Sequence, residues 1–401
     1  MKKKQRIAFF ILSGVALFWG VSFIHLYNDR NQTGFIESNA GIIYKDENLN
    51  QKYGMQKIND KTYYFDPNTG YLDSGFHTIK NKTYYFNENG KLYSGLKKIN
   101  KNIYFFNKDG SIVKNTFKKI QRDNQKQIVY FNESGKINKK TTLNIDNIQY
   151  TFDTQGNLQY DIDYLKNQTE KIASAYGGKT SVYFKDLTNN QLFSLNDTTY
   201  YPCCMIKVPA LAAVFQAIEQ GKFSYDDYKF YIDNMIIVSD NTSYNRLMKL
   251  IGDGNGQAGL QKVNQICNAV GMKNTQLNHG LRPGEDYFGN NTPNVSSAKD
   301  SAILFEALYN GNVISKESSA QMIELLKKCE DYDGIYRGIP HSIPYAHKTG
   351  ELSNIYNDGG IVYLPNRNYI LVVYTQDSSY KYELMNEISS FIYSYQKTFA
   401  N

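Results

Sequence analysis

Three short groups of residues between positions 160 and 401 have side chains suited to acyl transfer. The first is Cys204 with Lys207, the second is Ser239-Asp240-Asn241, and the third is Lys348-Thr349-Gly350. The first group contains a nucleophile, the second a hydroxyl and the third a cation, each near a residue that can orient it. Any one of them arises by chance, but all three in this order indicate a catalytic site.

The spacing of Cys204 and Lys207 indicates that their side chains can interact. Residues three positions apart share one face of a helix, so the amine of Lys207 can reach the sulfur of Cys204. The positive N-terminal end of a helix favours a thiolate or an oxyanion at the same place. A cysteine needs less help from a base than a serine, and it forms a thioester, which reacts readily with amines.

The second and third motifs supply side chains that can bind substrate and protonate a leaving group. The hydroxyl of Ser239 can pass a proton to a leaving nitrogen, and the amide of Asn241 can bind substrate. Lys348 and Thr349 can bind a carboxylate. An edge strand that contains Gly350 would let a peptide lie alongside its open backbone.

The motif order S-x-x-K, S-D-N, K-T-G resembles that of class A β-lactamases and penicillin-binding proteins. The flanking segments IKVPALAAVF, SDNTSYNRLM, HKTGEL and GGIVYLP are also similar to that family. The resemblance covers the whole C-terminal domain. It implies that Cys204 stands where the family has its serine nucleophile, with Lys207 as the activating base.

The resemblance also assigns the remaining site residues. Ser239, Asn241 and Lys348 take catalytic positions, while Thr349 and Gly350 bind substrate beside Lys348. The backbone N–H groups of Cys204 and Glu351 would form the oxyanion hole. No cofactor is implied, and the four cysteines lack the spacing of zinc ligands.

One family motif is missing. Class A β-lactamases have E-x-x-L-N between the second and third motifs, and its Glu activates the deacylating water. The stretch NTQLNHGLRPGEDYFGNNTPN lacks it. Glu285 and Asp286 are either substitute bases or ordinary solvated loop residues. We therefore expect acylation by a β-lactam or a D-Ala-D-Ala-like peptide, followed by slow release.

The N-terminus predicts attachment to a membrane. Residues 7–26 form an apolar run long enough to span a bilayer, and MKKKQR precedes it. The positive-inside rule places everything after residue 27 outside the cell. We expect an anchor over residues 1–27 and a linker over 28–50; a cleaved signal peptide is the alternative. Four of the +7 formal charges lie in that flank, and no basic stripe with interleaved aromatics follows, so nucleic-acid binding is not expected.

Residues 51–159 repeat a short aromatic unit. Aromatic-aromatic-Phe, a polar turn and Gly recur up to Gly70, Gly90, Gly110, Gly135 and Gly156. This pattern predicts β-hairpins that must stack to bury their aromatic faces. The units resemble the cell-wall-binding repeats of Gram-positive surface proteins, which implies peptidoglycan or another wall polymer as partner. A stacked spacer without a ligand is the alternative.

The repeats depart from the choline-binding pattern. That pattern uses Trp to build an aromatic cage around a quaternary ammonium. The corresponding positions hold Met55, Phe76 and Leu96, and the single Trp of the chain is Trp19. We therefore do not expect choline binding.

Residues 160–401 alternate helical and strand patterns, which predicts an α/β domain with a mixed or antiparallel sheet and a helical lobe. Cys267 and Cys329 are interpreted as buried apolar side chains, with a disulfide as the alternative. The sequence thus predicts a cell-surface acyl hydrolase or transferase that acts on β-lactams or peptidoglycan peptides. A catalytically degenerate wall-binding protein and a spacer-displayed adhesin are the competing hypotheses.

Overall fold

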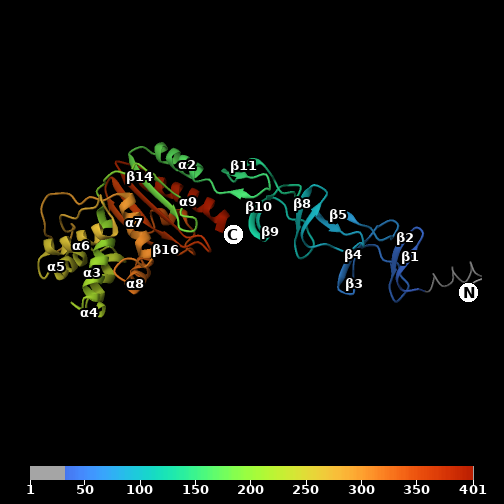
Figure 1. Cartoon of the computed structure of the whole chain (residues 1–401), viewed down its shortest axis with the longest axis horizontal. Helices are drawn as coiled ribbons and strands as arrows, with labels where there is room; N and C mark the ends of the chain where they lie inside the picture. The colour runs from blue at the N-terminus through green and yellow to red at the C-terminus, as the bar shows by residue number, and fades with distance from the viewer. Residues whose placement is uncertain (1–31, 401) are drawn as a thin grey trace, which may run out of the picture. The chain divides into compact units, whose positions relative to one another are not determined.

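The computed structural model describes residues 32–400, which form two compact units (Figure 1). The first unit runs to Lys140 and includes Thr154–Asn157; the second comprises Thr141–Asp153 and the chain from Leu158 onward. The expected membrane span, residues 7–26, lies outside the described residues. Within residues 32–400, no helix combines the length and apolar character that crossing a bilayer requires.

The first unit is a series of antiparallel hairpins, as the aromatic repeats predict. Its strands are β1 (Gly34–Ser38), β2 (Gly41–Lys45), β3 (Gly54–Ile58), β4 (Lys61–Phe65), β5 (Gly75–Ile79), β6 (Lys82–Phe86), β7 (Gly95–Ile99), β8 (Asn102–Phe106), β9 (Thr116–Arg122) and β10 (Gln125–Phe131). The β1–β2 hairpin lies in the segment expected to be a linker. Two-residue turns join the two strands of each hairpin, and in the β3–β4 turn φ is positive at both positions, 46° at Asn59 and 61° at Asp60. Turns of this kind match the twist of paired strands.

Neighbouring hairpins are joined through backbone and side chains. Leu92 N donates to Thr62 O at 2.8 Å, and Ile112 N donates to Thr83 O at 2.8 Å. At Gly90 φ is 64°, and a Cβ atom there would lie 2.4 Å from the side chain of Leu72. The recurring glycine is therefore needed both for the turn and for the close approach of the preceding hairpin.

The second unit is built on a five-stranded antiparallel sheet with the order β15-β14-β18-β17-β16. Its strands are β14 (Lys179–Asp186), β15 (Leu192–Leu195), β16 (Tyr345–Leu352), β17 (Ile355–Val362) and β18 (Tyr369–Gln376). A small separate sheet holds β11 (Thr141–Ile145), β12 (Ile148–Phe152) and β13 (Leu158–Gln159). Strand β16 lies at an edge of the large sheet, as expected for the strand that contains Gly350.

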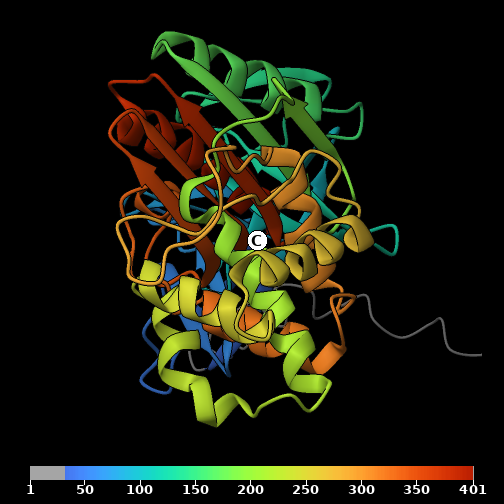
Figure 2. The same cartoon turned by 90° about the vertical axis from the view of Figure 1, so that its left-hand side faces the viewer.

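Helices cover both faces of the large sheet (Figure 2). On one face α9 (Lys381–Ala400) packs on β17 and β18, and α2 (Ile162–Ala175) packs on α9. On the other face α7 (Ala298–Tyr309) contacts β14, β17 and β18. The helical lobe contains α3 (Lys207–Glu219), α4 (Tyr225–Ile236), α5 (Asn241–Ile251), α6 (Gly256–Val270) and α8 (Lys316–Leu326). Short 3-10 turns, η1 (Cys203–Ile206) and η2 (Ile335–Gly338), complete the unit.

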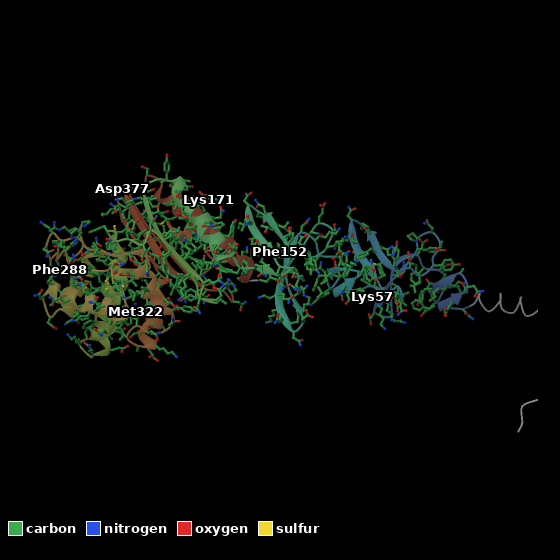
Figure 3. The ribbon with its side chains drawn as sticks, turned by 45° about the horizontal axis from the view of Figure 1, so that its top comes forward. Lys57, Phe152, Lys171, Phe288, Met322 and Asp377 are labelled. Atoms are coloured by element: carbon green, nitrogen blue, oxygen red, sulfur yellow. The ribbon has the colours of Figure 1, made fainter. Side chains whose placement is uncertain are left out.

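The core of the lobe surrounds α3. Its residues from Lys207 to Phe215 are all buried, which is expected for a helix that is apolar on every side. Phe288 and Met322 lie in the helical part of the unit, whereas Asp377 follows β18 at the end of the sheet (Figure 3). A buried central helix gives the residues at its N-terminus a rigid support.

Candidate active site

Cys204 lies in η1, immediately before α3. The preceding Cys203 has a φ of 50°, a left-handed conformation that few non-glycine residues adopt. Cys203 is buried, and burial raises the pKa of its thiol. Cys204 is only partly buried. The local backbone therefore presents the second thiol of the pair, which is the one in register with Lys207.

The amine of Lys207 is fully buried and lies among four polar atoms. Its Nζ is 3.3 Å from Cys204 Sγ, 3.1 Å from Ser239 Oγ, 2.5 Å from Ser239 O and 2.7 Å from Asn241 Oδ1. Burial lowers the pKa of Lys207 to about 8, against the opposing influence of the Cys204 sulfur. An amine with such a pKa can both hold and release a proton near neutral pH.

The thiol of Cys204 has a lowered pKa. Burial alone would raise it, but the charges of Lys207 and Lys348 and hydrogen bonds from Ser239 and Lys207 outweigh that effect. The sulfur also lies 3.7 Å from Asn241 Oδ1. A thiolate is therefore more populated here than in an ordinary cysteine.

The loop between α4 and α5 positions the second motif. Ser239 has a φ of 57°, and the side chain of Asp240 caps α5 by accepting from Ser243 N at 2.6 Å. Asn241 Nδ2 donates to Pro283 O at 3.0 Å, so both ends of that amide are held. This fixes the hydroxyl and the amide on the side of Lys207 that faces Cys204.

The edge strand β16 brings the third motif to the same place. Lys348 is fully buried, and its Nζ donates to Thr349 O at 3.0 Å. A Cβ atom at Gly350 would lie 2.7 Å from the backbone nitrogen of Cys204. Only glycine lets β16 come this close to η1. The side chain of Glu351 accepts a hydrogen bond from Lys381 Nζ of α9 at 2.8 Å.

Sequence reasoning missed Asp331. Its carboxylate accepts from Thr349 Oγ1 at 2.6 Å and from Tyr356 OH at 2.7 Å. Burial opposes ionisation of Asp331, but these hydrogen bonds outweigh it and lower its pKa. The only sequence signal is the acidic segment CEDYDG, which belongs to no motif.

A cavity of about 490 Å³ opens beside the second and third motifs. Ser239 and Lys348 line it, together with Cys329 and three acidic residues, Glu330, Asp331 and Asp333. It offers space for a ligand group next to the candidate catalytic side chains.

Other candidate residues have structural surroundings. Glu285 pairs with Arg246 at 2.8 Å, and Asp286 pairs with Arg246 and Lys249 at 3.0 Å each, on an exposed part of α5. Both are thus ion-paired loop residues. Cys267 and Cys329 are both free and buried, which favours the interpretation as apolar packing.

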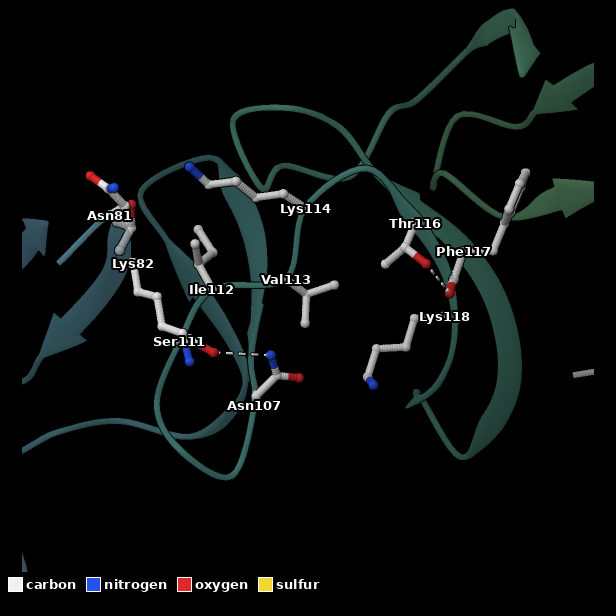
Figure 4. A pocket seen from close by; sticks show the side chains of 11 residues that line it. Asn81, Lys82, Asn107, Ser111, Ile112, Val113, Lys114, Thr116, Phe117 and Lys118 are labelled. Atoms are coloured by element: carbon white, nitrogen blue, oxygen red, sulfur yellow. Dashed lines mark hydrogen bonds between the residues drawn. The ribbon is translucent and has the colours of Figure 1, made fainter. Parts of the chain in front are cut away.

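The first unit has a separate cavity of about 500 Å³ (Figure 4). Three lysines line it, namely Lys82, Lys114 and Lys118, with Phe117 among several polar side chains. Lys82 pairs with Asp109 at 3.1 Å. This lining is cationic, unlike the aromatic cage that binds a quaternary ammonium.

A model of the beta-lactamase enzyme family matches residues 164–231 and 228–396, more than half of the chain. The chain belongs to this family. A model described as a putative cell wall binding repeat matches residues 56–68, 74–92 and 94–112. Both resemblances inferred from the motifs and the aromatic repeats are confirmed.

Solved structures of the family share the fold of the second unit. PBP-A is similar over 59% of this chain and 97% of its own, with a TM-score of 0.51 and 21% identity. A beta-lactamase from Sphaerobacter thermophilus is similar over 58% of this chain and 96% of its own, with a TM-score of 0.51 and 21% identity. The TLA-1 extended spectrum beta-lactamase is similar over 59% of this chain and 99% of its own, with a TM-score of 0.52 and 20% identity. No curated protein matches the sequence.

Proposed function

We propose that the second unit is an acyl hydrolase or acyl transferase that forms a thioester on Cys204. The acyl donor is a β-lactam or a D-Ala-D-Ala-type peptide of the cell wall. The observation that carries this proposal is the 3.3 Å contact between Lys207 Nζ and Cys204 Sγ, with lowered pKa values on both groups. Membership of the beta-lactamase family supports it, as does a PBP-A variant solved as an acyl-enzyme complex with penicillin G.

In the acylation step the thiolate of Cys204 attacks the carbonyl carbon, and the C–N bond of the donor breaks. The leaving nitrogen receives a proton from the Lys207 ammonium through the hydroxyl of Ser239, which lies 3.1 Å from Nζ. Lys207 is left neutral, as its pKa of about 8 allows. Backbone N–H groups of Cys204 and Glu351 serve the developing oxyanion.

In the second step an amine or water attacks the thioester and gives its proton to neutral Lys207, and the thiolate leaves. Hydrolysis is slow because the loop sequence lacks the E-x-x-L-N motif and its Glu285 and Asp286 are ion-paired with Arg246 and Lys249 of α5. An amine is a better nucleophile than water and does not need that base. Transfer to an amine is therefore the favoured outcome.

We further propose that the first unit holds the enzyme on the cell wall. The match to a putative cell wall binding repeat supports this role. The basic flank and apolar run of residues 1–27 favour a position on the outer face of the membrane. The lysine-lined cavity favours an anionic wall polymer over choline.

Intact mass spectrometry tests the thioester. The purified chain is incubated separately with a penicillin and with a D-Ala-D-Ala ester. We expect an adduct on Cys204 that prior alkylation blocks and that Cys204→Ala lacks while it remains folded. An added amine should shorten the life of the adduct. Absence of an adduct from both donors would favour the non-catalytic wall-binding hypothesis.

A further inference from the structure

The hydroxyl of Thr349 already has an acceptor inside the chain. In the family resemblance, Lys348 and Thr349 form the pair that binds a substrate carboxylate. A hydroxyl has one proton to donate, and that of Thr349 goes to Asp331 at 2.6 Å. Tyr356 OH donates to the other carboxylate oxygen at 2.7 Å, which holds Asp331 in this position. The carboxylate of Asp331 thus accepts the hydrogen bond that a substrate carboxylate would need from Thr349.

The charges around the cavity point the same way. Among the residues of 32–400 that line it, Lys348 is the one cation, against Glu330, Asp331 and Asp333. Lys348 also helps to keep Asp331 ionised. A substrate carboxylate would enter beside a fixed negative charge, and like charges placed together at a binding site weaken binding strongly.

We propose that this site takes an acyl donor whose group beside Lys348 and Thr349 is not a carboxylate, and that Asp331 sets this preference. The donor has an uncharged or positively charged group there, such as an amide or an amine. This inference rests on the thioester chemistry proposed above and specifies its substrate class. Asp331 is a specificity residue and takes no part in bond making.

A matched pair of donors tests the proposal on the native chain. One is an N-acylated D-Ala-D-Ala peptide with a free terminal carboxylate, and the other is its C-terminal amide. The rate of thioester formation on Cys204 is followed by mass spectrometry. We expect the amide to react about tenfold faster, and raised salt to narrow the difference because it screens the repulsion.

Two charge-removing variants separate Asp331 from the general acidity of the cavity. Asp331→Asn should raise the ratio of the acid rate to the amide rate about tenfold. Asp333→Asn removes the same charge from the same cavity at a residue that is not the acceptor of the Thr349 hydroxyl, and it should change the ratio of the two rates much less.

The outcomes are distinct. A native chain that reacts faster with the acid than with the amide overturns the preference, even if the variants do not fold. Equal effects of Asp331→Asn on both donors, or equal effects of the two variants, overturn the role of Asp331. A chain that reacts with neither donor contradicts the thioester chemistry itself.

Discussion

Lys207 and Cys204 stabilise each other in a site where neither would be charged alone. A buried ammonium without partners would lose its proton, and burial does lower the pKa of Lys207 to about 8. The sulfur, two oxygens of Ser239 and the amide oxygen of Asn241 surround the amine and offset part of that cost. The two groups therefore titrate as a pair, and the thiolate–ammonium form is the reactive one.

This pairing predicts the reactivity of the four cysteines. Cys204 should alkylate faster than Cys203, Cys267 or Cys329, since burial raises the pKa of each of the other three. A lowered pKa means that the thiolate of Cys204 persists to lower pH than in a free thiol. The pH at which its alkylation rate begins to rise should therefore be lower than for a free cysteine, as measured with iodoacetamide and peptide mapping.

Replacing the lysine gives the control. Lys207→Met removes the nearby cation, so the pKa of Cys204 rises and alkylation at neutral pH falls by about tenfold. Lys249→Met removes a lysine that pairs with Asp286 and should leave the rate unchanged. An unchanged rate in Lys207→Met would show that Lys207 does not activate the thiol.

Motif spacing predicted the residues that meet around the sulfur, but not Asp331. Cys204, Lys207, Ser239 and Asn241 each belong to a motif, and the structure brings them within hydrogen-bonding reach of one another. Asp331 reaches Thr349 only because the chain after α8 folds back over β16. A contact of that kind depends on tertiary packing, which no local pattern reports.

The approach of β16 to η1 decides whether the site is assembled. The residues on each element can be read from the sequence, but the distance between them depends on the sheet. Strand β17 helps to fix it, because Asn357 Nδ2 donates to Tyr201 O at 3.0 Å just before η1. Gly350 pairs with Asn357 across β16 and β17. Two neighbouring strands therefore contact the segment Tyr201–Cys204, Asn357 at Tyr201 and Gly350 at Cys204.

Adding one methyl group should therefore disrupt the site. In Gly350→Ala the new Cβ would lie 2.7 Å from Cys204 N and 2.8 Å from Pro202 O, which are backbone atoms and cannot simply rotate away. We expect a loss of about 2 kcal/mol in stability and a fall of about 100-fold in adduct formation. Leu352→Ala, at an exposed position of the same strand, should change neither. Thermal unfolding and adduct kinetics measure both effects, and a fully active Gly350→Ala would show that the close approach is dispensable.

Strand and helix patterns predicted most elements and missed the β1–β2 hairpin. The aromatic units predicted the hairpins from β3 onward, but the Asn/Asp-x-x-Gly segments after the aromatics are not the hairpin turns. The turn precedes the aromatic strand, as at Asn59-Asp60 between β3 and β4. The β1–β2 hairpin has the sequence GFIES and GIIYK, without that aromatic signature, and was expected to be linker. The strand order of the large sheet joins β14 to β18 across most of the second unit, so it could not be inferred from local periodicity.

The two compact units divide the repeats unevenly. The β11–β12 hairpin carries a repeat-like sequence, yet it belongs to the second unit. Tyr150 stacks on Tyr395 with ring centroids 5.8 Å apart, and its hydroxyl lies 3.0 Å from Thr398 Oγ1 of α9. Aromatic stacking and a buried hydroxyl contact stabilise such packing. The last repeat thus belongs to the second unit and packs on α9.

The first unit should bind cell walls without using choline. Binding of a quaternary ammonium needs aromatic faces, but the cavity between its hairpins is lined by Lys82, Lys114 and Lys118. The amine of Lys118 already lies over the ring of Phe105 at 4.3 Å, so that aromatic face has a cation of the chain on it. A further cation would be repelled, whereas phosphate or carboxylate groups of a wall polymer would be attracted.

A wall pull-down tests this expectation. The purified chain should sediment with isolated walls, resist elution by millimolar choline and be released by raised salt, because salt screens contacts between exposed charges. Changing Lys82, Lys114 and Lys118 together to Gln should weaken binding roughly tenfold. The same change at three exposed lysines elsewhere in the unit, Lys57, Lys61 and Lys98, removes equal charge and should weaken it much less. Elution by choline would contradict the proposal that the lysine-lined cavity binds an anionic polymer. Equal losses of binding in the two triple variants would show that the net charge of the unit, and not this cavity, is responsible for wall binding.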